Sequence, residues 1–510
     1  MNTPRTSLFT LGALTVAIAS SFAAVRVVAS NQEDVPAAPV PPQFLTPPLH
    51  APEQVAQTIG RHLLYIPVSG VSSPSGSGVA VPATLSATTQ TVGTTIDVTN
   101  ALDSYQGEPM LMRQGARLVG GYNSIYPGKC SAALANCAPG SASSSDGTTW
   151  SNARLPLTVN GYAFLIGFDP SVAVDAANTV YYAYGVSDGS TSGKNAIAVA
   201  SSPDGVTWTL KTPVTFNSGG QFDDKYWIAA DPRKVGRLYV GWDRNKGNSQ
   251  TLFVAVSTDG GTTWTPPIKV NDGTTKFERV IYAFPAVDPQ SGIVYLAWLD
   301  YAKNTIFVDK STNGGLTWGK DVAAARTHIG FGKDIGCNGG RSMTPAPQLG
   351  IDGNGILYLT YADDVGKGTG YDIFFVKSSN GGVSWSAPIK LNGDTGSAHQ
   401  YNPAVSVLPD PTGTVSVSWY DRRNDANNCT TDLYATVSTD GGATFSANIR
   451  VTPTGSNYDG NPNGPGDYSG NAPSGTTTGF PFWCSHLASD IAKETGTAGA
   501  FEIDTAPVSH

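Results

Sequence analysis

The sequence predicts an all-β fold, a seven-bladed β-propeller built from four-stranded antiparallel blades. Three observations predict it. A short turn motif recurs six times, apolar and polar residues alternate with a period of two between the copies, and the aromatic residues that close the copies lie 54 to 67 residues apart. A repeat of this length indicates an array of similar units, and period-two alternation indicates strands.

The turn motif is most regular at Ser257–Trp264, which reads STDGGTTW. Asp-Gly or Asn-Gly supplies the positive φ of a tight hairpin turn, and Ser and Asp side chains hydrogen-bond turn backbone. We therefore expect the motif to direct folding and to take no part in chemistry. The other copies are Ser143–Trp150, Ser201–Trp208, Ser311–Trp318, Ser378–Trp385 and Ser438–Phe445.

Each unit reads as four strands, A to D. Strand A ends in an Asp-Pro or Asp-Gly turn, strand B ends in an aromatic residue, strand C runs into the repeated turn, and strand D leaves it. The third unit shows this order at 228–232, 238–242, 252–256 and 268–270. The aromatic residues that end strand B predict seven units and are Tyr122, Tyr184, Trp242, Trp298, Tyr361, Trp419 and Trp483.

The last unit, with strands at 467–470, 480–483 and 501–503, lacks strand D. Residues 95–98, ahead of the first unit, read as the missing strand. Pairing the two chain ends would close a ring and remove the exposed edges that an open array keeps. Six blades are the alternative, because the last unit has no repeated turn.

The N-terminus has the parts of a secretory signal peptide: Arg5, the apolar run Leu8–Ile18, and small residues through Ala24. We expect a signal peptide at 1–30, a Pro/Ser/Gly-rich linker or wrapping segment at 31–93, and the propeller at 94–510. The chain should be secreted, periplasmic or on the cell surface, with no membrane span after signal removal. Its net charge of −8 without a basic block argues against a nucleic-acid partner.

Five cysteines in an exported chain predict disulfides. Cys130 and Cys137 lie in one short loop and should pair. Cys337, Cys429 and Cys484 offer one further pair, for which we expect Cys337–Cys429.

The repeated turns resemble the Asp-box of the bacterial neuraminidase repeat, and residues 95–510 resemble secreted sialidase-like propellers. The resemblance implies a protein that acts on glycans. For sialidases it implies six blades, three arginines around the substrate carboxylate, a tyrosine nucleophile assisted by a glutamate, and an aspartic acid/base. It also implies an Arg-Ile-Pro motif, which is missing here, since Tyr65–Pro67 is the nearest text.

Polar residues gather before strand A and after strand B, on the rim opposite the repeated turns. The resemblance suggests Tyr468 as the nucleophile, Glu278 as its assistant, and Asp223 or Asp224 as the acid/base. Alternatively, Tyr468 is a buried aromatic of strand A, and the Asp–Arg pairs brace neighbouring blades. The candidate substrate-binding residues are Arg244, Arg422, Arg423, Asp421, Asp243, Arg279, His399 and Asp467.

Residues 459–467 partly match a calcium loop. Asp459, Asn461, Asn463 and Asp467 would supply the oxygen ligands, but the glutamate expected at position 12 is replaced by Gly470. Calcium is therefore possible, against a plain Gly/Pro loop, and no cofactor is required.

Two functions follow. The first is a sialidase-like glycoside hydrolase acting on glycans with acidic sugars, and the second is a non-catalytic propeller that binds carbohydrate or protein. Convergence of Arg244, Arg422, Glu278 and Tyr468 on one axial pocket would favour the hydrolase. Engagement of each arginine by a neighbouring group would favour the binding protein. The sugar, the linkage and the oligomeric state stay open.

Overall fold

The computed structural model divides the chain into two units, residues 1–43 and 44–510. All described residues belong to the second unit, so the expected signal peptide and most of the expected linker lie outside them. The described ranges are 80–99, 105–125, 137–189, 193–273, 278–338, 342–366, 370–459, 464–473, 477–486 and 501–510. They form strands and turns, and within them no helix is long and apolar enough to cross a membrane.

The strands form successive antiparallel sheets, here numbered in chain order. Sheet 1 comprises β4 (Tyr105–Gln114), β5 (Arg117–Ile125), β6 (Gly140–Ser144) and β7 (Ser151–Arg154). Sheet 2 comprises β10 (Ile166–Val174), β11 (Val180–Ser187), β12 (Asn195–Ser202), β13 (Thr209–Leu210) and β14 (Thr215–Asn217). Sheet 3 comprises β15 (Phe222–Ala230), β16 (Leu238–Lys246), β17 (Ser249–Ser257) and β18 (Ile268–Lys269).

The next sheets repeat this order. Sheet 4 comprises β19 (Val280–Val287), β20 (Val294–Asp300), β21 (Thr305–Ser311) and β22 (Val322–Arg326), and a single parallel bridge joins it to sheet 3. Sheet 5 comprises β25 (Gln348–Ile351), β26 (Leu357–Asp363), β27 (Asp372–Ser378) and β28 (Ile389–Lys390). Sheet 6 comprises β29 (Gln400–Val407), β30 (Val415–Asp421), β31 (Asp432–Ser438) and β32 (Ile449–Arg450).

Sheet 7 joins the two ends of the described chain. Its own strands are β33 (Gly470–Pro473), β34 (Thr478–Ser485), β35 (Glu502–Thr505) and β36 (Val508–Ser509), and β3 (Ile96–Asp97) and β2 (Thr91–Val92) pair antiparallel with β35 and β36. The expected pairing of residues 95–98 with the last unit is therefore present. Two short ribbons, β8 (Thr158–Val159) with β9 (Tyr162–Ala163) and β23 (Lys333–Asp334) with β24 (Ser342–Met343), lie between sheets.

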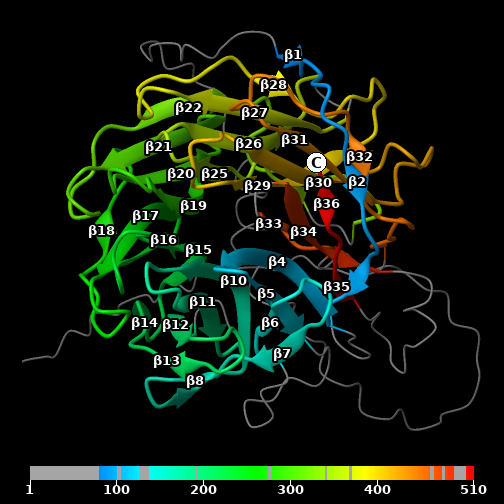
Figure 1. Ribbon diagram of the computed structural model, residues 1–510. Helices are drawn as coiled ribbons and strands as arrows, with labels where there is room; N and C mark the ends of the chain where they lie inside the picture. Colours follow the sequence, from blue (N-terminus) through cyan, green and yellow to red (C-terminus); the bar gives the residue numbers. More distant parts are fainter. Residues whose placement is uncertain are drawn as a thin grey trace, which may run out of the picture. The chain divides into compact units, whose positions relative to one another are not determined.

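Consecutive sheets contact one another through their first strands (Figure 1). β4 lies against β10, and the series continues through β15, β19, β25, β29 and β33. β33 in turn lies against β4. The middle strands are consequently covered on both faces, and every residue of β11 and β12 is buried.

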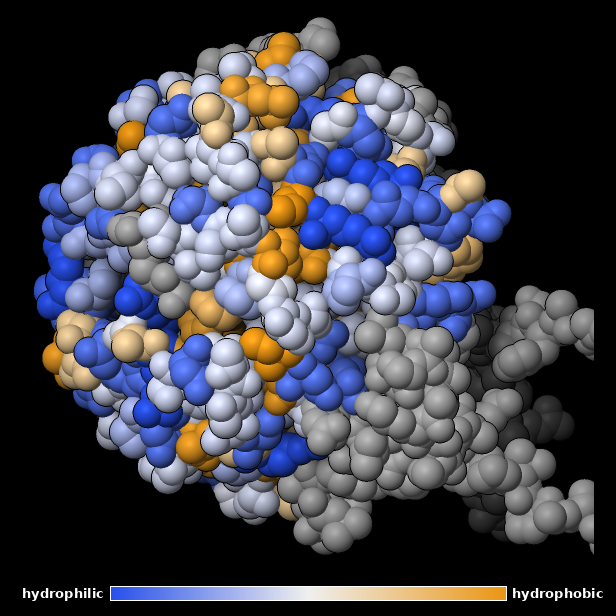
Figure 2. Space-filling view, turned by 45° about the vertical axis from the view of Figure 1, so that its right-hand side comes forward, coloured by the Kyte–Doolittle hydropathy of each residue, from blue (hydrophilic) through white to orange (hydrophobic). Residues whose placement is uncertain are grey.

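The core contains the aromatic residues that the sequence placed at the end of strand B. Trp242, Trp298, Trp419 and Trp483 are each at most 1% exposed. Large aromatic side chains dominate core energetics, so these residues anchor their sheets. The face in Figure 2 is mainly hydrophilic, with separate hydrophobic patches.

The repeated turns have the geometry expected of a folding motif. Ser257 donates its hydroxyl hydrogen to Asp259 (2.8 Å) and accepts from the Gly261 N–H (2.9 Å), while Gly260 and Gly261 have φ values of 70° and 82°. The Gly260 N–H donates to the carbonyl of Gly236, in the turn between β15 and β16. The two kinds of turn therefore share one rim, as predicted, and we call it the turn rim.

Residues 80–99 form an N-terminal strap along the outer strands. β1 (Val81–Pro82) pairs in parallel with β28 of sheet 5, and the Ser86 N–H donates to the carbonyl of Phe445 in sheet 6 (2.7 Å). β2 and β3 then join sheet 7, and the Asn152 amide of sheet 1 donates to the carbonyl of Val98 (2.9 Å). The strap is thus hydrogen-bonded to sheets 5, 6, 7 and 1. Figure 1 shows its first strand, β1, next to β28.

Candidate functional site

The first strands of five sheets carry a bulge where a non-glycine residue has a positive φ. The pairing register shifts at each of these points. Residues with side chains rarely adopt this conformation, and such strain gathers at functional sites. The residues are Glu108, Asp169, Lys225, Tyr282 and Asn402, with φ between 44° and 65°.

Three of these residues meet Asp467 and Tyr468 in what we call the inner cluster: Glu108, Asp169, Lys225, Asp467 and Tyr468. The Lys225 Nζ lies 2.5 Å from Asp467 Oδ2, 3.5 Å from Asp169 Oδ2 and 3.9 Å from Glu108 Oε1. The Asp467 N–H donates to Glu108 Oε1 (3.1 Å). Burial opposes the charge of Lys225, but the surrounding carboxylates outweigh it and raise its pKa.

Asp169 is the member of the inner cluster whose pKa burial raises most clearly among its carboxyl groups. Burial raises its pKa well above the ordinary value, the Lys225 charge opposes that rise, and the neighbouring Glu108 adds to it. Burial likewise raises the pKa of Tyr468, whose hydroxyl donates to the carbonyl of Pro170 (3.2 Å). A carboxyl with a raised pKa beside other carboxyl groups is an acid–base arrangement, but these residues are at most 4% exposed, so a sugar ring cannot reach them in this conformation.

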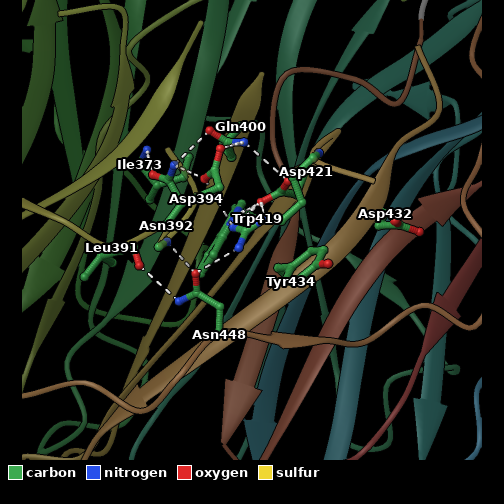
Figure 3. Close-up of polar contacts among 12 residues, drawn as sticks. Ile373, Leu391, Asn392, Asp394, Gln400, Trp419, Asp421, Asp432, Tyr434 and Asn448 are labelled. Carbon is green, nitrogen blue, oxygen red and sulfur yellow. Dashed lines mark hydrogen bonds and ion pairs between the residues drawn. The ribbon is translucent and has the colours of Figure 1, made fainter. Parts of the chain in front are cut away.

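A second polar assembly lies where sheets 5 and 6 meet, at the strand ends opposite the turn rim. We call Asn392, Asp394, Gln400, Asp421, Arg423 and Asn448 the rim network. The Asn392 amide donates to Asp394 (2.7 Å) and to Gln400 (2.9 Å), and the Gln400 amide donates to Asp421 (3.3 Å). Figure 3 shows these side chains and Asn448 turned toward one another.

Arg423 is held from several sides. Its Nε and Nη2 donate to Asp421 Oδ2 (2.9 and 2.6 Å), and its Nη1 donates to Asn448 Oδ1 (3.2 Å). Its guanidinium carbon stands 4.2 Å from the centre of the Tyr434 ring. Asp421 is fully buried, whereas the side chains of Arg423 and Asp394 are 17% and 13% exposed. The buried members thus position the exposed ones.

The two arginines predicted to hold a substrate carboxylate are already engaged. Arg244 forms a two-pronged pair with Asp223 (2.6 and 2.9 Å), its cross-strand partner in sheet 3. Arg422 is fully buried and donates to the carbonyls of Ile335, Gly336, Cys337 and Asn428 and to the Thr431 hydroxyl. The Asp223–Arg244 brace lies within one sheet, not between blades as the alternative interpretation held.

Glu278 and Arg279 lie at the sheet 3–sheet 4 boundary. Glu278 pairs with Lys269 (3.0 Å) and accepts from the Thr251 hydroxyl (3.2 Å), so its hydrogen bonds do not reach Tyr468. The Arg279 guanidinium donates to the carbonyls of Asn248 and Glu278.

The remaining predicted residues have local partners. His399 accepts at Nδ1 from the Tyr371 N–H (3.2 Å), and Asp224 accepts from the Lys225 N–H (3.0 Å). Asp243 accepts from the Asn245 amide (3.1 Å), and burial followed by the Asp224 charge raises its pKa well above the ordinary value.

The candidate calcium loop falls only partly within the described residues. Asn461 and Asn463 lie outside them, the Asp459 N–H donates to Asn457 (2.9 Å), and Asp467 is paired with the Lys225 ammonium. Across the described ranges, no group of three or more His, Cys, Asp or Glu residues is placed to hold a metal ion.

The disulfide prediction is confirmed for Cys337–Cys429, whose Cα atoms are 5.1 Å apart. Cys137 is also in a disulfide, and its expected partner Cys130 lies outside the described residues. Cys484 is a buried free thiol.

Sequence reasoning missed Glu108, Asp169 and Lys225, together with the rim residues Asn392 and Asp394. One signal was available for the first two. Each immediately precedes a proline at the start of a first strand, as Asn402 does before Pro403. The recurrence of an acidic or amide residue directly before a proline could have predicted that Glu108 and Asp169 lie in equivalent places in their sheets.

No protein-family model and no curated protein matches this chain. Several solved structures are similar. An α-L-arabinanase of Penicillium chrysogenum complexed with arabinobiose is 14% identical, with 65% of this chain and 94% of that chain covered and a TM-score of 0.43. An ulvan lyase is 13% identical (79% and 93% covered, TM-score 0.47), and an intramolecular trans-sialidase of Ruminococcus gnavus is 14% identical (81% and 96%, 0.42). The structural neighbours thus include enzymes that act on glycans.

Proposed function

We propose that this chain is a secreted seven-bladed β-propeller that acts on glycans. The seven sheets are its blades. The contact of β33 with β4 and the pairing of β3 with β35 support a closed ring, because both join the two ends of the series. The disulfide between Cys337 and Cys429 supports an oxidising compartment, and the repeated turns support the resemblance to Asp-box propellers.

The rim network is the glycan-binding site, and binding without cleavage is the function that the geometry supports best. One observation carries this conclusion. The partly exposed Arg423 and Asp394 are fixed by the buried Asp421 and Asn392, so donors and acceptors for sugar hydroxyls are held in place before the ligand arrives. Groups fixed in this way lose little conformational entropy on binding.

The preferred ligand is a neutral glycan. Arg423 lies between two carboxylates, Asp421 at 2.6 Å and Asp394 at 3.7 Å, so its charge is already compensated. A sugar carboxylate placed here would meet Asp394 as well as Arg423. The acidic sugar expected from the sialidase resemblance therefore does not suit this site.

The test is a neutral and acidic glycan array probed with the wild-type protein and with Asp394→Ala and Arg423→Lys variants. We expect binding to a neutral glycan and at least tenfold weaker binding in both variants, since each loses a charged hydrogen-bonding group. Lys246→Gln, an exposed change at the end of β16, is the control. An array without neutral-glycan binding, or variants that bind as the wild type does, would refute the assignment.

Hydrolysis at the inner cluster is the second candidate. The placement of Asp169 and Glu108 around Lys225, with the raised pKa of Asp169, favours it. In this case the buried centre must open during turnover. Tyr468 and Asp169 would then act together, as the sequence suggested for Tyr468, whereas Glu278 and Asp223 would not take part. Release of a fluorophore from aryl glycosides that Asp169→Asn and Tyr468→Phe both abolish would establish hydrolysis. Folded wild-type protein without activity across the panel would exclude it.

A further inference from the structure

A groove on the turn rim, between sheets 3 and 4, encloses about 260 Å³. The turn of sheet 3 contributes Thr258 and Trp264, and the turn of sheet 4 contributes Asn313 and Leu316. Arg237, which lies in the turn between β15 and β16, also lines the groove. A cation, an aromatic ring and hydroxyl groups therefore face one small space.

Arg237 differs from two arginines at the opposite strand ends, Arg244 and Arg423. It is half-buried beside the Tyr239 hydroxyl and, within the described part of the chain, forms no ion pair. Arg244 and Arg423, by contrast, are paired with aspartates at 2.6 Å. The groove thus holds a positive charge that the fold has not compensated.

Comparison of the repeated sheets shows that the fold does not need a positive charge at the position of Arg237. In sheets 1 to 6 a residue at or next to the start of the second strand pairs with the serine of the repeated turn. In sheet 3 this residue is Leu238, which pairs with Ser257, and Arg237 precedes it. Its counterparts in sheets 1, 2, 4, 5 and 6 are Arg117, Thr179, Ile293, Ile356 and Thr414. Arg117 donates to Ser143 and to the carbonyl of Asp204, so it braces two turns, and the others are uncharged.

The other groove residues present complementary surfaces. Trp264 is half-buried, and its Nε1 donates to the carbonyl of Thr212 (2.9 Å), which fixes the ring plane. Thr258 is exposed, and Leu316 is 53% exposed. An aromatic face and an apolar side chain cover the C–H face of a sugar, while an arginine fork matches a carboxylate.

We infer that this groove binds an acidic sugar residue of a glycan, with Arg237 pairing with the sugar carboxylate and Trp264 covering the ring. The site goes beyond the proposed function, because it lies at the strand ends opposite the rim network and takes a different class of sugar. Two sites of different charge preference would let one molecule contact two parts of a mixed glycan.

The experiment is a calorimetric or NMR titration of the full chain with sodium glucuronate, with glucose and with inorganic phosphate. We expect glucuronate to bind more tightly than glucose and phosphate. Arg237→Ile places in sheet 3 the residue that sheet 4 has at Ile293, and it should weaken glucuronate binding at least tenfold. Arg237→Lys, which keeps the charge, should retain part of the binding.

Arg423→Lys separates the two sites. It should leave glucuronate binding unchanged while it weakens neutral-glycan binding, and Arg237→Ile should do the reverse. The inference is overturned if glucuronate does not bind, if phosphate binds as well as glucuronate does, or if Arg237→Ile binds glucuronate as the wild type does. Unchanged thermal unfolding of Arg237→Ile verifies its fold, since an isoleucine is accommodated at both Ile293 and Ile356.

Discussion

Two aspartates, Asp272 and Asp321, join the outer ends of sheets 3 and 4. The Asp272 N–H donates to Asp321 Oδ2 and the Asp321 N–H donates to Asp272 Oδ2, each at 3.1 Å. The other oxygen of Asp321 is buried and has no hydrogen-bond donor among the residues that the structure describes. Burial raises the pKa of Asp321 to about 7, the Asp272 N–H opposes the rise, and the charges of Asp272 and Asp309 add to it. Burial raises the pKa of Asp309 to about 6.

Asp321→Asn should therefore stabilise the protein above neutral pH. The folded chain holds the Asp321 proton more tightly than the unfolded chain, so this contribution is full below the ordinary pKa of 3.8 and is lost as the pH rises through about 7. The rise of the Asp321 pKa from 3.8 to about 7 sets an upper bound of about 4 kcal/mol on the stability that the protein loses when this carboxyl ionises. Because Asp321 is half-buried and water screens its charge, we expect the variant to gain about 1 to 2 kcal/mol at pH 8 and almost nothing at pH 4.

The chain itself shows that asparagine fits this position. Asn448 occupies the equivalent place in sheet 6, ten residues after the motif serine, and accepts from the Gly393 N–H (2.7 Å). Urea unfolding of the wild type and of Asp321→Asn, at pH 4 and at pH 8, gives the difference in their free energies of unfolding at each pH. If the two proteins are equally stable at pH 8, or if the variant gains the same amount at both pH values, then burial of the Asp321 carboxylate does not destabilise the folded chain as described.

Three further predictions follow from buried polar groups and from the strap. Arg422→Met should lower the free energy of unfolding by about 3 kcal/mol or more, because several buried carbonyls lose their donor, and Arg422→Lys should not restore it; denaturant titration measures both. Lys225→Met should cost about 3 to 5 kcal/mol at pH 8 and less at pH 5, where carboxylates can take up protons; equal losses at both pH values would contradict this. Deleting residues 1–89 should lower the melting temperature and expose β28 to proteolysis, since β1 no longer covers that edge; mass spectrometry of the fragments locates the cleavage.

Much of the sheet architecture was predictable because the turn chemistry repeats. Glycines with positive φ and serine–aspartate hydrogen bonds are local requirements, so they can be read from the residues at Ser257–Trp264. The buried aromatics at Trp242 and Trp298 follow from alternation alone. The pairing of residues 95–98 with the last sheet could be predicted from counting strands, because a missing strand at one end matched a spare one at the other.

The sites were harder to predict, for a physical reason. A bulge resets the alternation of side chains, so the sequence pattern does not show that Lys225 turns inward or that β15 begins at Phe222, ahead of the predicted strand. Asp223 was expected in a loop and instead lies in that strand, opposite Arg244. Which carboxylate an arginine meets depends on strand register, and register is set by the whole sheet.

The strap gives the chain an unusual order of assembly. Hydrogen bonds between β3 and β35 join residues more than 400 positions apart, so β3 has no partner strand until almost the whole chain has been made. Contacts this distant in sequence form late and slowly. A protein of this design would complete its structure only after synthesis ends, which suits a polypeptide that crosses a membrane as an extended thread and folds on the far side.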